Sequence, residues 1–400
     1  MARIHQQPWW GAPKNFNERK HNRKVSWLEL FYDLVYVAAI AQLTHQLAAH
    51  PTWHEVANAF LLFTMIFWSW INGSQYYDLH GGDNIRTRLL TFWQMLGMAA
   101  IAITIHSFFE GHHQSLTLAF IFIQIMITYI WWSVGFWDPS HRVFSRFYTT
   151  NYLIAFLLLI ISYFLDYKYV APVWIVVLLL NLSPGLIGAR TIVKGMKERG
   201  QVFTASEAII ERFGLFTIIV LAESILGTVS GVAEIQHKEP VAWIAFFLGI
   251  LISFLLWSIY FDLTSQRDTR TGYRYLQLLI FLHFPLLFAM SVVGACIKVL
   301  LEDMHTGVHG TVLWIFCIAM AVLLLMIVAL TAVMEQEEGD LSYVRPTVKV
   351  LLAVTAIALL VPLFSKWLNT PIFLGIITLL LFIPVFSGVS FWIRYRYKKE

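Results

Sequence analysis

Twelve long apolar stretches, separated by short polar breaks, constrain the fold of this chain more than any other feature. A helix needs about 20 mostly apolar residues to cross a bilayer, and each stretch is close to that length. Charged residues make up 13% of the chain, about half the roughly 25% of soluble domains. We therefore expect an all-α polytopic membrane protein. The predicted spans are residues 26–48, 55–76, 89–109, 115–137, 149–165, 169–189, 208–231, 241–262, 275–299, 310–334, 348–365 and 371–393.

Lysine and arginine are distributed unequally between alternate connections. Positive residues collect on the cytoplasmic side of membrane proteins. If the N-terminus is inside, only four of the 28 Lys and Arg residues fall outside: Lys168, Lys238, Lys298 and Lys366. The sequence therefore predicts that both termini are cytoplasmic. The net charge of +4 then reflects topology, so we expect the lipid bilayer as a partner and no nucleic acid.

The two halves of the chain share an ordered set of local similarities. Glu29 opens the run ELFYDL in the first span, and Glu211 opens ERFGLF in the seventh. Asp78 and Asp262 each close a span after two aromatic residues. Two halves of six spans have the same orientation, as in parallel repeats. The predicted organisation is a basic cytoplasmic tail (1–25), a first six-helix repeat (26–190), a cytoplasmic linker (191–207) and a second six-helix repeat with a short basic tail (208–400).

Two motifs carry a family resemblance. Residues 27–37 read WLELFYDLVYV after a basic tail, and residues 211–216 read ERFGLF, followed by LAES at 221–224. Together they resemble the signatures of the bacterial low-temperature-requirement A family, LtrA, in which Gly is more usual than Ala222. The resemblance covers nearly the whole chain. It implies an integral protein of the bacterial inner membrane, but it supplies no defined biochemical activity.

A weaker similarity concerns the lysosomal potassium and proton channel family. Its members also pair two six-helix repeats and carry Phe-Ser-Asp in the first helix of each. Here residues 31–33 read FYD in that place, whereas residues 213–215 read FGL and lack the Asp. This similarity is therefore only a hint.

Ionisable residues inside the first span are the first candidates for function. A charge in a membrane span costs about 2.5–3.5 kcal/mol on insertion scales, so such residues are functional candidates by default. Glu29 and Asp33 are four residues apart on one helix face, and Tyr36 continues that stripe. The pair either handles a cation or proton at the inner mouth or docks against an arginine such as Arg86 or Arg212.

A second candidate lies deeper, in the seventh span. Glu223 is twelve residues beyond Glu211, about 18 Å along a helix and near the middle of the membrane. It suits proton coupling, and it also suits a neutral acid bonded to a neighbouring helix. On the first span, Gln42 and His45 form another polar stripe, nearer the outer mouth. Small residues that allow close helix packing follow Glu223: Gly227, Ser230 and Gly231.

Histidines gather near the predicted outer side. His50/His54 and His305/His309 have the i,i+4 spacing that can bind a metal on one helical face. No HExxH motif or cysteine ligand accompanies them, so a pH-sensing or solvated cluster is favoured and the metal stays unknown. His283, in the ninth span, is either a relay group or a hydrogen-bonded core histidine.

The inner connections carry a further set of charges, which we expect to form a network: Asp78, Arg86, Arg88, Asp262, Arg270 and Arg274.

The leading hypothesis is a transporter or channel for a small solute or cation (H⁺, K⁺ or Na⁺), linked to protons through buried carboxylates at the repeat interface. Its main residues are Glu223, Glu29, Asp33 and Glu211. The alternatives are an intramembrane enzyme or a receptor that holds a lipid or cofactor, and a structural protein of membrane stress adaptation. No catalytic motif is visible, the cofactor is unknown, and a homodimer remains open.

Overall fold

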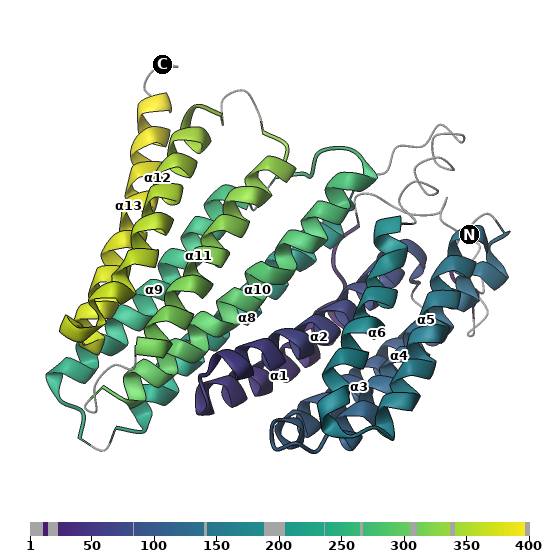
Figure 1. Cartoon of the computed structure of the whole chain (residues 1–400). Coiled ribbons are helices and arrows are strands. Elements are labelled where there is room, and N and C mark those ends of the chain that lie inside the picture. The colour runs from purple at the N-terminus through teal and green to yellow at the C-terminus, as the bar shows by residue number, and fades with distance from the viewer. Residues whose placement is uncertain are drawn as a thin grey trace. The chain divides into compact units, whose positions relative to one another are not determined.

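The structure is a computed structural model, and it describes residues 11–14, 23–82, 84–139, 142–187, 205–235, 237–264, 267–304, 310–336 and 341–396. Twelve helical segments in these ranges are long and apolar enough to cross a membrane (Figure 1). This confirms the predicted all-α fold with twelve spans.

The first six long helices follow one another along the chain. They are α1 (Trp27–Ala49), α2 (Trp53–His80), α3 (Ile85–Phe109), α4 (Gln114–Trp137), α5 (Arg142–Tyr163) and α6 (Tyr167–Ile187). The second six are α8 (Glu207–Ala233), α9 (Pro240–Thr264), α10 (Tyr273–Glu302), α11 (Gly310–Val333), α12 (Leu341–Leu360) and α13 (Thr370–Arg396). A short 3₁₀ helix, η3 (Val361–Trp367), continues the span of α12.

Large apolar side chains cover the outside of these helices. The exposed fraction is 80% at Ile103, 78% at Phe164 and 68% at Leu379. In water such surface would be unfavourable, because apolar area is expelled from water. Lipid is the solvent in which these faces are stable, so the helices fit an integral membrane protein.

Several helices are longer than the apolar runs that predicted them. The third span was expected from residue 89, but α3 begins at Ile85 because the side chain of Asn84 accepts a hydrogen bond from the backbone N–H of Thr87. Such capping satisfies one of the free N–H groups of the first turn. The extension places Arg86 inside the helix. An apolar run measures the lipid-facing length, whereas capping and backbone bonds set the helix ends.

The eleventh span also departs from a simple helix. The α-helix α12 ends at Leu360, and Pro362 lies at the start of η3, where Phe364 leaves the helical backbone region. Proline lacks an N–H and cannot continue the helical ladder. In contrast, Pro184, Pro285 and Pro384 lie inside continuous helices α6, α10 and α13.

Contacts between residues divide the chain into two compact units. Unit 1 contains Met1–Leu43, Leu61–Arg212 and Thr271–Gln277, and unit 2 contains Thr44–Phe60, Phe213–Arg270 and Leu278–Glu400. The division falls within α1, α2, α8 and α10. The bounds of these units do not tell whether the first six helices and the second six have the same fold. The two six-helix repeats therefore stay a prediction.

A buried polar network joins three helices of unit 1. The Oδ1 atom of Asn72 in α2 accepts hydrogen bonds from Trp131 Nε1 in α4 (3.0 Å) and from Tyr152 Oη in α5 (2.7 Å). In Figure 1, α3, α4, α5 and α6 run as neighbours, and α4 contacts both α3 and α5. The charged residues described next lie on the α1, α2 and α8 segments of the same unit.

Within unit 2, α9 packs against α11 and α13, and α12 packs against α11 and α13. The close approach of α8 to α10 depends on glycine: a Cβ on Gly227 would lie 2.9 Å from the carbonyl oxygen of Gly294. The small-residue stripe that the sequence placed after Glu223 thus faces α10 at Gly227 and Gly231, while Ser230 bonds to its own helix at Leu226.

Candidate functional site

The inner end of α1 carries two buried carboxylates. We call "inner" the end of the spans that we predict to face the cytoplasm. Glu29 and Asp33 are 1% and 0% exposed, and they lie one turn apart on the same face of the helix. Burying two carboxylates in apolar surroundings requires charged or hydrogen-bonding partners.

Arg212 bridges both carboxylates. Its Nε donates to Asp33 Oδ2 (3.2 Å), its Nη2 donates to Asp33 Oδ1, and its Nη1 donates to Glu29 Oε1 (3.3 Å). Arg212 lies in the second turn of α8 and is itself buried. A forked guanidinium can bind two acceptors in one plane, which a lysine cannot do. Of the two arginines proposed from the sequence as docking partners, the structure brings Arg212 to the pair.

A second arginine approaches from the segment before α1. Arg23 donates to both oxygens of Glu29 (2.6 and 2.9 Å) and to Asp78 Oδ1 (3.3 Å). Burial of the guanidinium opposes its charge, but Glu29 and Asp78 outweigh it and raise the pKa of Arg23 above its usual value. The hydroxyl of Ser206 also donates to Asp78 (2.5 Å). The result is one connected set of charges, the inner charge network: Arg23, Glu29, Asp33, Asp78 and Arg212.

Aromatic side chains complete the surroundings of Arg212. Trp70 Nε1 of α2 donates to Asp33 Oδ1 (2.6 Å). The guanidinium carbon of Arg212 lies 5.5 Å from the centre of the Tyr32 ring and 5.7 Å from that of Trp70. Both distances fit cation–π attraction, which is stronger away from water.

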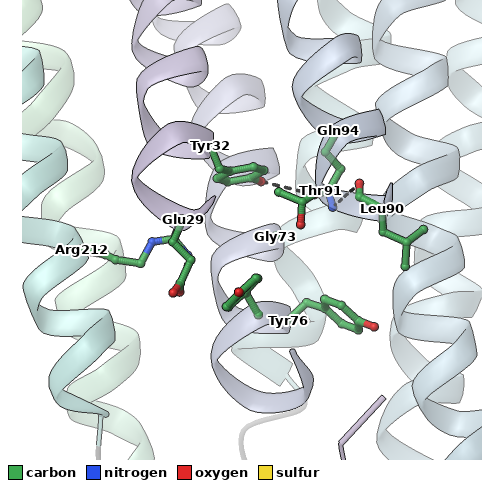
Figure 2. Close-up of a pocket in the computed structure, with 9 residues that line it drawn as sticks. Glu29, Tyr32, Gly73, Tyr76, Leu90, Thr91, Gln94 and Arg212 are labelled. Carbon is green, nitrogen blue, oxygen red and sulfur yellow. Dashed lines mark hydrogen bonds and ion pairs between the residues drawn. The ribbon is translucent and has the colours of Figure 1, made fainter. Parts of the chain in front are cut away.

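A narrow pocket opens beside this network in unit 1 (Figure 2). Figure 2 shows Arg212 reaching toward Glu29 on one side and Tyr32 reaching toward Gln94 of α3 on the other. Its free space is close to what about one water molecule needs. The lining residues are Glu29, Tyr32, Gly73, Tyr76, Tyr77, Leu90, Thr91, Gln94 and Arg212.

Buried hydroxyls extend from this pocket. Tyr32 Oη donates to Tyr36 Oη (3.0 Å), and Tyr36 Oη shares a 2.6 Å hydrogen bond with Ser69 Oγ of α2. Tyr32 Oη also lies 3.3 Å from Gln94 Oε1. Tyr36, which the sequence placed on the Glu29–Asp33 stripe, therefore joins the site through hydroxyls and not through a charge.

Arg86 occupies a separate position. It is 2% exposed, and its guanidinium donates to Tyr76 Oη (2.8 Å) and Ser133 Oγ (2.6 Å). Tyr76 lines the pocket, so Arg86 lies behind that ring. Within the described residues its guanidinium has no carboxylate partner. Its neighbour Arg88 is exposed and takes no part in the buried contacts.

Three other predicted residues lie on exposed helix surfaces. Gln42 and His45 are exposed on α1, and Glu211 is exposed on α8 immediately before the buried Arg212. The structure does not bring them to the inner charge network. Their assignment to a transport path stays a prediction.

Glu223 and His283 belong to unit 2. Glu223 is half-buried on α8, eleven residues and three turns beyond Arg212. No hydrogen-bond or ion-pair partner of its carboxylate occurs in the described part of the chain. His283 is buried, with Nε2 at 2.9 Å from Tyr260 Oη and Nδ1 at 2.8 Å from the carbonyl of Leu279. Both ring nitrogens of His283 thus have partners, as in a hydrogen-bonded core histidine.

Of the two histidine pairs, only His50/His54 lies in the described ranges. His50 lies in the connection after α1 and His54 in the first turn of α2, so these two do not share a helical face, contrary to the expectation from their spacing. His305 and His309 lie outside the described residues. No group of three or more metal-ligating side chains is present where the chain is described.

The charged residues at the inner end of the second half of the chain are more exposed to solvent than the inner charge network. Asp262 is exposed and accepts a hydrogen bond from Ser258 (2.9 Å), and Arg270 and Arg274 are exposed. Of the six residues expected to form an inner network, only Asp78 joins the buried charges around Glu29.

Sequence reasoning missed Arg23, Trp70, Ser69 and Gln94 as members of the site. A signal existed for two of them. Trp70 has a donor-only N–H in an apolar span, which needs an acceptor when buried. Gln94 is an amide in a membrane span, where polar groups find partners on neighbouring helices.

Comparison with known proteins agrees with this architecture. An uncharacterised protein of Rhizobium meliloti (strain 1021) is 27% identical over 256 residues, which cover 62% of this chain and 61% of that protein. The match thus spans about three-fifths of the relative. No solved structure matches. The family model described as "Bacterial low temperature requirement A protein (LtrA)" matches residues 24–382, a range that includes Glu29, Asp33, Asp78 and Arg212 of the inner charge network and begins one residue after Arg23. Since that range also contains nearly all of the twelve spans, the chain belongs to the LtrA family of membrane proteins.

Proposed function

We propose that this protein is a membrane transporter or channel for a small solute or cation and that its activity is linked to protons. The observation that carries the proposal is the inner charge network beside a pocket. Glu29 and Arg212 belong to both. Ionisable groups inside a membrane are costly and are retained mainly where they handle ions, protons or substrates.

The contacts suggest how a proton would act. Glu29 is held by Arg23 and Arg212, and Asp33 is held by Arg212 and Trp70. A proton that reaches Glu29 through the pocket removes the negative charge that holds two guanidiniums. The contacts of α1 with the segment before it and with the first turns of α8 would then loosen together. Such a change couples proton binding to the opening of the inner end.

The connections leave little room for another kind of site. The intervals between consecutive spans are short in sequence, and the longest, between α6 and α8, has 19 residues. The chemistry of the described chain therefore lies among its helices. Intramembrane enzyme or receptor functions remain the alternatives, and the absence of flux would favour them.

The test is flux in proteoliposomes that contain a pH-sensitive dye, under proton, potassium and sodium gradients. We expect wild-type flux, and we expect Glu29→Gln and Asp33→Asn to reduce it strongly in protein that still elutes as a folded species. Glu223→Gln tests the deeper carboxylate in the same assay.

The matched control is Glu207→Gln. Glu207 is exposed in the first turn of α8, so the same chemical change is made outside the network. Flux that survives both network substitutions would contradict the assigned path. The absence of wild-type flux under every gradient would contradict the proposal of ion movement itself.

A further inference from the structure

Three buried hydroxyls connect the pocket to a deeper level of the membrane. Tyr32 lines the pocket and donates to Tyr36, and Tyr36 is hydrogen-bonded to Ser69. The exposed fraction is 3% for Tyr32 and 0% for both Tyr36 and Ser69. The path starts at the pocket, on the level of Glu29. It reaches Tyr36, seven residues or about 10 Å further along α1, and ends at Ser69 on α2.

The pocket suits a water molecule better than a metal cation. Its lining contains one carboxylate, Glu29, and one guanidinium, Arg212, so their charges cancel. Glu29 already accepts hydrogen bonds from Arg23 and Arg212. K⁺ or Na⁺ would approach Arg212 without an uncommitted carboxylate to offset the repulsion. A water molecule fits the narrow space, and Tyr32 and Gln94 offer it polar partners.

Gly73 makes this arrangement sterically feasible. A Cβ at this position would collide with the Tyr32 hydroxyl and would lie 2.7 Å from Gln94 Oε1. The hydroxyl of Tyr32 thus occupies space on α2 that only glycine leaves open. A chain that used Tyr32 solely as an apolar packing residue would not need that space.

Beyond the hydroxyls the helices turn apolar. The next residues on this part of α1 and α2 are Ile40, Ile66 and Phe63, each fully buried. These three side chains offer no hydrogen-bonding group, so a proton passes them only where water enters; the buried hydroxyl of Thr64 lies between Phe63 and Ile66 in the sequence of α2. The hydroxyl path is therefore connected to the inner side and closed toward the outer side.

We propose that the pocket holds a water molecule and that Tyr32, Tyr36 and Ser69 relay protons between this water and the apolar layer. The water in the pocket gives a proton to Tyr32 Oη as it takes one from protonated Glu29, so that no cation is held beside Arg212, and the former proton of Tyr32 passes to Tyr36 Oη. The proton of Tyr36 passes to Ser69 Oγ, and that of Ser69 passes to water that enters when the layer opens. Each hydroxyl gains and loses one proton, so the relay ends unchanged. This inference rests on the proposed function.

The experiment measures proton uptake by proteoliposomes that contain a pH dye, at a potential set by potassium and valinomycin. Tyr36→Phe and Tyr32→Phe each remove one oxygen and keep the ring. We expect each to lower uptake per folded molecule at least about tenfold, because a positioned proton-transfer group contributes about 10²–10⁴-fold. Tyr129→Phe, on an exposed position of α4, is the matched control and keeps wild-type uptake. Ser69→Ala tests the end of the relay if a tyrosine variant does not fold.

The outcomes separate the relay from the proposed function. Wild-type uptake that is retained by Tyr36→Phe, Tyr32→Phe and Ser69→Ala overturns the relay and leaves transport standing. A lowered melting temperature with unchanged uptake per folded molecule shows that the hydroxyls are only structural, and it also overturns the relay. If the control Tyr129→Phe loses as much uptake as Tyr32→Phe and Tyr36→Phe, the relay is also overturned. No wild-type uptake under any gradient overturns the proton linkage of the proposed function, and the relay with it.

Discussion

Arg212 is the residue on which the inner charge network depends. It is bonded to Glu29 and Asp33 at once, and both carboxylates are almost fully buried. A buried ion pair adds little net stability, but removal of one partner leaves an uncompensated charge in apolar surroundings. The two carboxylates and the arginine should therefore behave as one unit in mutational tests.

We predict that Arg212→Gln destabilises the protein by about 3–5 kcal/mol, because Asp33 loses both guanidinium bonds and keeps the Trp70 N–H. Thermal or denaturant unfolding in detergent measures the loss. The double variant Arg212→Gln/Asp33→Asn should recover part of it, since the unpaired carboxylate is gone. Glu207→Gln should change stability by less than about 0.5 kcal/mol, as an exposed substitution does. Additive losses in the double variant would contradict a coupled unit.

At the scale of elements, the approach of α8 to α10 is set by glycine. A Cβ on Gly231 would lie 2.9 Å from the carbonyl oxygen of Lys298, and one on Gly294 would lie 3.1 Å from Ser224 Cα. Membrane helices gain little from apolar burial against each other, so close van der Waals contact through small residues drives their association. The sequence predicted this stripe on α8 but not its partner helix, because periodicity identifies a face and not its neighbour.

We predict opposite effects for two glycine substitutions in unit 2. Gly227→Ala should destabilise by about 1–3 kcal/mol, because its Cβ meets the backbone oxygen of Gly294, which cannot move cheaply. Gly375→Ala, in α13, has no atom within 4 Å of its new Cβ and should be neutral or stabilising by up to about 1 kcal/mol. Unfolding of the two variants side by side provides the measurement. An equal change in the free energy of unfolding for both variants would show that the contact between α8 and α10 does not require glycine at position 227.

At the scale of the whole molecule, the charge distribution predicts a topology with both termini in the cytoplasm. The native cysteines offer a convenient background for testing it, because Cys296 and Cys317 are both buried. A membrane-impermeant maleimide should therefore react with neither in the folded protein. A single introduced cysteine then reports on the side of the membrane where it lies.

We expect Glu110→Cys, in the exposed connection after α3, to be labelled in intact cells. Lys24→Cys, exposed before α1, should be labelled only after the membrane is disrupted. These results would place the inner charge network on the cytoplasmic side. The reverse labelling pattern would invert the topology, and labelling of both in intact cells would contradict the assignment of alternate sides.

The class of fold and the number of spans follow from the sequence alone, because lipid imposes a local rule: about 20 apolar residues make a spanning helix. The sequence also identified Glu29, Asp33 and Arg212 as candidates, since charge inside a span is unusual wherever it occurs. That Arg212 reaches the carboxylates while its neighbour Glu211 is exposed is visible only in the folded arrangement of the helices. The same arrangement also brought in Arg23, Trp70 and Ser69. Partner choice depends on how helices distant in sequence pack, and no local pattern carries that information.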